Sequence, residues 1–101
     1  MSKIKFAVIG CGHIGKRHAS MILGNDDFEL VALCDTKPKE ELGLENFIGA
    51  RFFNSLDAMI QSDVIIDAVA IATPNGYHQE QALKVLENNW HVVVEKPMAL
   101  T

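Results

Sequence analysis

The feature that most constrains this chain is an apolar run that ends in a cluster of glycines, "KIKFAVIGCGHIG", near its amino end. The run from Lys3 to Ile9 predicts a buried strand. Gly10, Gly12 and Gly15 close it with G-x-G-x-x-G spacing, and a helical pattern follows at once. A strand that turns this tightly into a helix indicates an α/β fold.

Apolar runs and helical segments alternate along the rest of the chain, which implies a parallel sheet with right-handed crossovers. The sequence therefore predicts one Rossmann domain over residues 1–101, a doubly wound parallel sheet with the strand order 3-2-1-4-5. The expected elements after the first strand are a helix over 13–23, a strand over 28–34, a short helix from about Pro38, an edge strand over 50–53, a helix after Ser55, a strand over 64–72, a helix over 75–89 and a strand over 91–95.

Helical spacing also predicts which side chains face the core. Ser55 is the expected N-cap of the second long helix. The predicted buried residues are Ile14, His18, Met21 and Ile22 in the first helix, Leu56, Met59 and Ile60 in the second, and Tyr77, Ala82, Val85 and Leu86 in the third.

The three glycines have separate roles in a loop that binds a dinucleotide. Gly10 permits the tight turn, Gly12 lets a pyrophosphate approach the backbone, and Gly15 lets the helix pack close to the strand. The helix N-terminus then presents free N–H groups and a partial positive charge to the phosphates. Cys11, His13 and Ile14 complete the predicted loop and contribute through their backbone.

Asp35 ends the second strand, twenty positions after Gly15. An acidic side chain there accepts hydrogen bonds from the adenosine ribose, and it repels the 2′-phosphate of NADP. The sequence therefore favours NAD as the cofactor. Lys37 is close enough in sequence to reach a 2′-phosphate, so NADP remains an open alternative.

The segment "ATPNGYH" follows the fourth predicted strand, where the strand order reverses and ligands bind. We expect Thr73, Pro74 and Asn75 to line the cofactor groove. Asn75 has a second interpretation, as the cap of the next helix. His78 lies on the first turn of that helix, and taken alone it would be an ordinary surface or half-buried histidine.

Composition excludes several classes of protein. The net charge of −4 argues against binding to nucleic acid, which needs a basic face. The longest apolar run is interrupted by Asp67 and is too short for a membrane span, and no signal peptide is evident. Cys11 and Cys34 lack metal-ligand spacing, so we expect no metal site, but two reduced, buried thiols in a cytoplasmic protein.

Taken together, "AVIGCGHIGKRH", the "CD" that ends the second strand, and "AIATPNGYHQEQALKVLENNWHVVVEKPMAL" resemble the N-terminal domain of the glucose–fructose oxidoreductase/inositol dehydrogenase/MocA (Gfo/Idh/MocA) family. The resemblance covers essentially the whole chain. The glycine loop is shared by many dehydrogenases, whereas "ATPN..H" combined with "EKP" is much more specific. The segment "VEKPMALT" is further similar to a branch that acts on UDP-N-acetyl-2-amino-2-deoxyglucuronate-like sugar nucleotides.

The resemblance implies an NAD(P)-dependent oxidoreductase that transfers hydride between a sugar, sugar-nucleotide or cyclitol hydroxyl and nicotinamide. It implies that Lys96 is catalytic, hydrogen-bonding the reacting hydroxyl and assisting proton transfer. Glu95, Lys96 and Pro97 would also position the cofactor. His78 enters the site only through this resemblance.

Family members continue after EKP into an α+β domain that completes the substrate pocket, so we expect this chain to be a fragment without that domain. It should bind the cofactor, lack dehydrogenase activity by itself and self-associate through exposed apolar surface. A stand-alone NAD(H)-sensing module is the main alternative, although a sensor has no need of a lysine after the fifth strand. A methyltransferase-like domain fits the glycine spacing and the "ATPN" segment less well.

Overall fold

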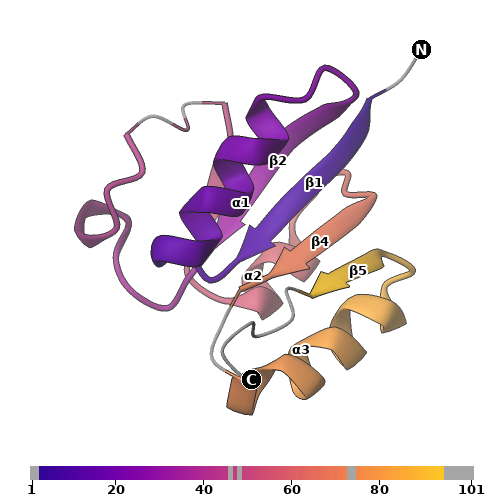
Figure 1. Cartoon of the computed structure of the whole chain (residues 1–101). Helices are drawn as coiled ribbons and strands as arrows, with labels where there is room; N and C mark the ends of the chain where they lie inside the picture. The colour runs from indigo at the N-terminus through magenta and orange to yellow at the C-terminus, as the bar shows by residue number, and fades with distance from the viewer. Residues whose placement is uncertain (1–2, 46, 48, 73–74, 95–101) are drawn as a thin grey trace, which may run out of the picture.

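The computed structural model describes residues 3–45, 47, 49–72 and 75–94. In this part of the chain five parallel strands form one sheet in the order β3-β2-β1-β4-β5, which confirms the predicted order. The chain runs from β1 toward one edge and then toward the other, so the strand order reverses between β1 and β4 (Figure 1). The strands are β1 (Ile4–Ile9), β2 (Phe28–Cys34), β3 (Arg51–Phe53), β4 (Ala68–Ile71) and β5 (His91–Val94).

The helices of the described chain connect these strands, and they are α1 (His13–Leu23), the short 3-10 helix η1 (Lys39–Glu41), α2 (Leu56–Gln61) and α3 (Asn75–Glu87). The bounds of α1 and β2 agree with the sequence prediction. Ser55 caps α2 as expected, because its Oγ accepts a hydrogen bond from the Ala58 N–H at 3.0 Å. Among the described residues, no helix combines the length and apolar character needed to cross a membrane.

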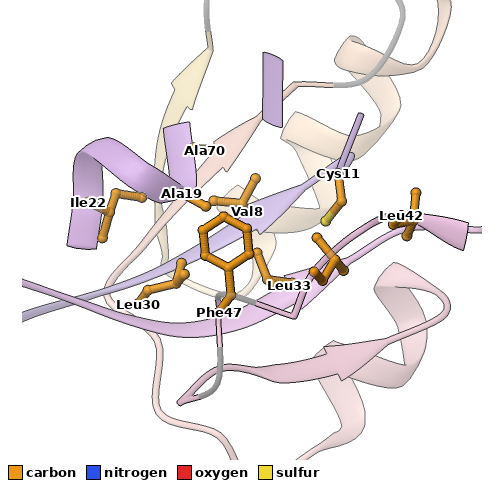
Figure 2. Packing of buried hydrophobic residues seen from close by; sticks show 10 residues of the cluster. Val8, Cys11, Ala19, Ile22, Leu30, Leu33, Leu42, Phe47 and Ala70 are labelled. Atoms are coloured by element: carbon orange, nitrogen blue, oxygen red, sulfur yellow. The ribbon is translucent and has the colours of Figure 1, made fainter. Parts of the chain in front are cut away.

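The sheet is covered on both faces, because successive strand residues point to opposite sides. Val8 and Leu33 pack under α1 and the segment after η1, whereas Ala7 and Ile9 pack against α2 and α3. Figure 2 shows the first cluster, with Phe47 lying over the strands. The buried members of this first cluster are Val8, Cys11, Ala19, Ile22, Leu30, Leu33, Leu42, Leu44, Phe47 and Ala70.

The predicted buried face of α1 is partly wrong. Gly15, Ala19 and Ile22 are buried, whereas the side chains of Ile14 and Met21 are 45% and 65% exposed. Helical spacing alone favoured the larger apolar residues. The close approach of α1 to the turn before it instead places its small residues against the sheet.

Two predictions for the second half also need correction. Strand β4 begins at Ala68 rather than at residue 64, although Ile66 in the preceding segment is still buried. Leu86 was predicted to face the core, but its side chain is 56% exposed. Val85 is fully buried at the position that faces the sheet, so Leu86 is rotated toward solvent by one helical step.

Candidate functional site

The turn after β1 needs glycine at two positions for different physical reasons. Gly10 has a φ of 91°, a left-handed conformation that glycine adopts without strain. A Cβ at position 15 would overlap the carbonyl oxygen of Gly10, so only glycine lets α1 start this close to the turn. Both roles agree with those expected from the spacing of the motif.

Gly12 is different, because a Cβ there would meet no atom within 4 Å. It is the N-cap of α1, with extended backbone and no side chain to accept from the first N–H groups of the helix. No acidic side chain stands in the first turn of α1. The helix start is thus open to an external anion, which its partial positive charge favours.

The carboxylate of Asp35 is tied to this turn. Its Oδ2 accepts a hydrogen bond from the Cys11 N–H at 2.7 Å, and its Oδ1 accepts one from the Lys37 N–H at 2.9 Å. The Gly10 N–H also donates to the Cys34 carbonyl at 2.7 Å. The glycine turn and the end of β2 therefore hold each other in place. Each carboxylate oxygen retains acceptor capacity for a ligand hydroxyl.

Asp35 and the glycine turn open into one cleft with a volume of about 470 Å³, beyond the carboxyl ends of β1, β2 and β4. This is where ligands bind in open α/β sheets. A second, more open hollow of about 680 Å³ adjoins it through Thr36 and includes Lys39 and Glu40. The cleft is lined by Ile9, Gly10, Gly12, Cys34, Asp35, Thr36, Lys37, Leu42, Ser55, Leu56, Ala72 and Gln81.

Cys34 lines the cleft and Cys11 belongs to the glycine turn beside it, and both thiols are free and buried. Burial, with the negative charge of Asp35 adding to it, raises the pKa of Cys11 from its ordinary 9.0 to about 12. Burial raises the pKa of Cys34 to about 12 as well, with further contributions from Cys11 and Asp35. Thiols with such pKa values stay protonated at neutral pH and are poor nucleophiles. The Cys11 thiol instead donates weakly to the Cys34 carbonyl at 3.6 Å.

The structure brings together part of the predicted site. Gly10, Gly12 and Asp35 line the cleft, and the buried Cys11 is joined to Asp35 through its backbone N–H. His13, Ile14 and Gly15 form the first turn of α1, while Asn75 and His78 stand in the first turn of α3, where the structure describes the backbone. Asn75 is the first helical residue rather than the residue before the helix. Residues outside the described part of the chain are Thr73, Pro74, Glu95, Lys96 and Pro97.

Several lining residues were not predicted as site residues. Leu42, Leu56 and Gln81 come from segments far apart in sequence and meet at the cleft only through the fold. Ser55 was recognised as a cap, not as part of the site. The pairing of Cys34 with Phe53 brings the end of β3, and hence Ser55, beside Asp35. No local sequence signal marks this proximity.

Comparison with known proteins agrees with this architecture. Residues 4–101 match the model of the Gfo/Idh/MocA family, described as an oxidoreductase family with an NAD-binding Rossmann fold. The WlbA dehydrogenase from Bordetella pertussis, solved with NADH and UDP-GlcNAcA, superposes with a TM-score of 0.83 and 45% identity, over 96% of this chain and 30% of that one.

Curated relatives give the same result. D-glucoside 3-dehydrogenase from Escherichia coli is 37% identical over 99% of this chain and 29% of its own length. The NADP-dependent scyllo-inositol 2-dehydrogenase IolU from Bacillus subtilis is 37% identical over 95% of this chain and 29% of its own length. The chain thus spans less than a third of the length of these relatives.

Proposed function

The chain belongs to the Gfo/Idh/MocA oxidoreductase family, and from this premise we propose that its cleft binds NAD through the glycine turn and Asp35. One observation carries the proposal: the open start of α1 and a half-buried carboxylate lie in the same cleft at the reversal of strand order. Neither feature alone would specify a dinucleotide. Together they provide for both its phosphates and its ribose.

Different residues of the cleft would bind different parts of the cofactor. The first N–H groups of α1 and the Gly12 backbone take the pyrophosphate, with His13 and Ile14 contributing main-chain groups. Asp35 accepts hydrogen bonds from the adenosine ribose. Thr73, Pro74, Asn75 and His78 complete the groove in this proposal, on the strength of the sequence motif. When bound, the nicotinamide supplies the hydride chemistry.

NAD is the favoured cofactor, because the Asp35 carboxylate is fixed in place by two backbone N–H groups and would repel a 2′-phosphate. Lys37 lines the same cleft, and Lys39 lines the adjoining hollow, which keeps NADP as the alternative. Competition between the two cofactors distinguishes them. Equal affinity for NADPH and NADH would refute the role given to Asp35.

For the longer protein that such a domain serves, we propose a dehydrogenase acting on a sugar, sugar-nucleotide or cyclitol hydroxyl. Lys96 hydrogen-bonds the reacting hydroxyl and assists its deprotonation, while Glu95 and Pro97 help to place the cofactor. The similarity to a dehydrogenase solved with UDP-GlcNAcA supports a sugar nucleotide as the substrate class. The EKP segment and the family match favour this enzyme over a stand-alone NAD(H) sensor.

The 101 residues by themselves should bind the cofactor and turn over no sugar, because hydride transfer needs a positioned, water-shielded substrate. We place the protein in the cytoplasm, in keeping with its two free thiols. Exposed Leu83, Leu86 and Val93 support self-association of the chain. A sedimentation profile that stays monomeric at high concentration would contradict that association.

Calorimetric titration with NADH tests the binding proposal. Gly12→Ala should leave the fold intact, because its Cβ would meet open space, yet it should weaken NADH binding by about tenfold or more by obstructing the phosphates. Gly49→Ala is the matched control, since a Cβ there also meets nothing within 4 Å and position 49 does not line the cleft. Failure of the unmodified chain to bind NADH would refute the proposal.

A further inference from the structure

The two edges of the sheet differ in how they are protected against pairing with a further strand. At one edge, Arg51 of β3 forms an ion pair with Asp63 at 2.7 Å, and its guanidinium lies 5.2 Å from the centroid of the Phe53 ring. Charged side chains of this kind are a usual protection of an edge strand. At the other edge, β5 has the sequence His-Val-Val-Val and contains no Asp, Glu, Lys or Arg. This second edge therefore lacks the charge that protects the first.

The backbone groups on the free side of β5 follow from its pairing with β4. The His91 N–H donates to the Asp67 carbonyl at 3.0 Å, so the backbone of His91 bonds toward β4. In a parallel ladder, residues that bond one neighbouring strand alternate with residues that bond the other. Val92 and Val94 therefore turn their N–H and C=O groups outward, and in the described part of the sheet no strand lies on that side.

Helix α3 places an apolar surface beside this free edge. Lys84 Nζ lies 3.1 Å from Asp57 Oδ1 of α2, so the Lys84 side of α3 faces α2, and Val85 is fully buried toward the sheet. At about 100° per residue, Leu83 and Leu86 occupy the side turned away from α2, and each is 56% exposed. Because α2 packs on β2 and β3 and α3 packs on β4 and β5, that side lies along the free edge (Figure 1).

Val93 extends the apolar surface to the other face of the sheet. Val92 packs in the cluster beneath α2 and α3, and successive strand residues point to opposite faces. Val93 therefore points to the face that α1 covers, where its side chain is 44% exposed. The free edge of β5 thus has exposed apolar side chains on both sides of its outward N–H and C=O groups.

We propose that a second copy of this chain pairs with the free edge of β5, antiparallel and about a two-fold axis at Val93. Val92 of each copy then exchanges both backbone hydrogen bonds with Val94 of the other, so that the two sheets become one. The two Val93 side chains lie opposite each other on one face, and Leu83 and Leu86 of the two copies meet on the other. The inference rests on the self-association proposed above and deepens it by assigning the surface.

Two observations favour a second copy as the partner. In the 101-residue chain, residues 95–101 follow β5, which is fewer than the dozen or more that a crossover to another parallel strand requires. A strand that pairs with its own copy also meets its own charges, and like charges opposite each other are destabilising. Arg51 therefore opposes such pairing at β3, whereas β5, Leu83 and Leu86 bring no charge to it.

Cysteine cross-linking tests the register of the pairing. Val93→Cys should join two copies through a disulfide, with diamide taking up the two thiol protons and two electrons. Opposed residues of this kind have Cα atoms about 4.5 Å apart, within the range of a disulfide. Met21→Cys, 65% exposed on α1, is the matched control, and Val93→Cys should cross-link at least about tenfold faster. The buried thiols of Cys11 and Cys34 should not cross-link.

Sedimentation equilibrium tests the surface itself. Leu86→Lys should weaken dimerisation about tenfold or more, because it places two like charges across the two-fold axis. Met21→Lys adds the same charge on α1, away from the edge, and should leave dimerisation unchanged. Both side chains are exposed, so both variants should fold, and urea unfolding checks this.

The outcomes separate this inference from the proposals on which it builds. If the unmodified chain stays monomeric at high concentration, self-association and this inference both fail. If the chain associates but Leu86→Lys associates equally well, or if Val93→Cys cross-links no faster than Met21→Cys, the assigned surface is wrong and self-association stands. Neither result bears on cofactor binding, which the NADH titration decides by itself.

Discussion

Asp35 and Asp67 stand at opposite ends of the sheet and make nearly the same hydrogen bond. Asp35 follows β2 and accepts from the Cys11 N–H at 2.7 Å, just past the carboxyl end of β1. Asp67 precedes β4 and accepts from the Lys5 N–H at 2.9 Å, near the amino end of β1. Each carboxylate holds one end of the central strand to a neighbouring segment.

Their surroundings differ. Asp35 is half-buried beside two glycines and lines the cleft, whereas Asp67 is exposed. The backbone of Asp67 also donates to the Lys5 carbonyl at 2.8 Å and accepts from the His91 N–H at 3.0 Å, which joins three strands. The same interaction therefore joins neighbouring strands at one end of the sheet and, at the other end, holds a carboxylate that lines the cleft. The difference between the two carboxylates comes from the strand order and from the glycines beside Asp35.

The two ends of α1 give the largest expected contrast. Gly15 lies in the first turn of α1, beside the carboxyl ends of the strands. Gly15→Ala should destabilise the protein by about 3 kcal/mol or more, because its Cβ overlaps the Gly10 carbonyl oxygen. Gly24→Ala at the other end should cost far less, since its Cβ would lie 3.5 Å from the Ser20 carbonyl oxygen, an ordinary contact. Urea unfolding measures both. Equal destabilisation would show that the glycine turn is no more constrained than the far end.

The thiols of Cys11 and Cys34, at the carboxyl ends of β1 and β2, should make the free energy of unfolding depend on pH. Because their pKa values are raised to about 12 in the folded state, their contribution to stability is complete below pH 9 and is lost as pH rises toward 12. At pH 10 the loss should reach about 1.4 kcal/mol per thiol. Urea unfolding between pH 8 and pH 10 measures it. Cys34→Ala should flatten the dependence, and an unchanged slope in that variant would contradict this account.

The smallest effect on stability is expected for Asp67→Ala, near the amino ends of the strands. Asp67→Ala removes one exposed side-chain hydrogen bond and leaves the backbone bonds of the same residue in place. The free energy of unfolding should fall by about 1 kcal/mol, the usual worth of such a bond. A loss as large as that of Gly15→Ala would mean that the two ends of the sheet are equally constrained.

The sequence predicted best what depends on local chemistry. The glycine spacing identified the turn, the alternation of apolar runs and helical segments gave the strand order, and α1 and β2 have the predicted bounds. The buried face of α1 was misjudged at Ile14 and Met21, because the close packing at Gly15 sets that face and apolar spacing does not. Small residues in close contact carry little hydrophobic signal.

The long-range part of the site was harder to predict. Ser55, Leu56 and Gln81 reach the cleft through the pairing of β2 with β3 and the placement of α3 beside α2. No local pattern encodes these contacts. Likewise, the apolar run before Ala68 suggested a longer strand, yet the backbone of Asp67 marks where β4 pairing begins.

The central claim is that Asp35 binds the cofactor while Asp67 only holds the sheet together. Calorimetric titration of NAD into the unmodified chain, Asp35→Ala and Asp67→Ala tests it directly. Asp35→Ala should weaken binding by about 1–3 kcal/mol, the scale of losing a charge-assisted hydrogen bond, and Asp67→Ala should leave the affinity unchanged. Equal weakening in the two variants, or full affinity in Asp35→Ala, would contradict the claim.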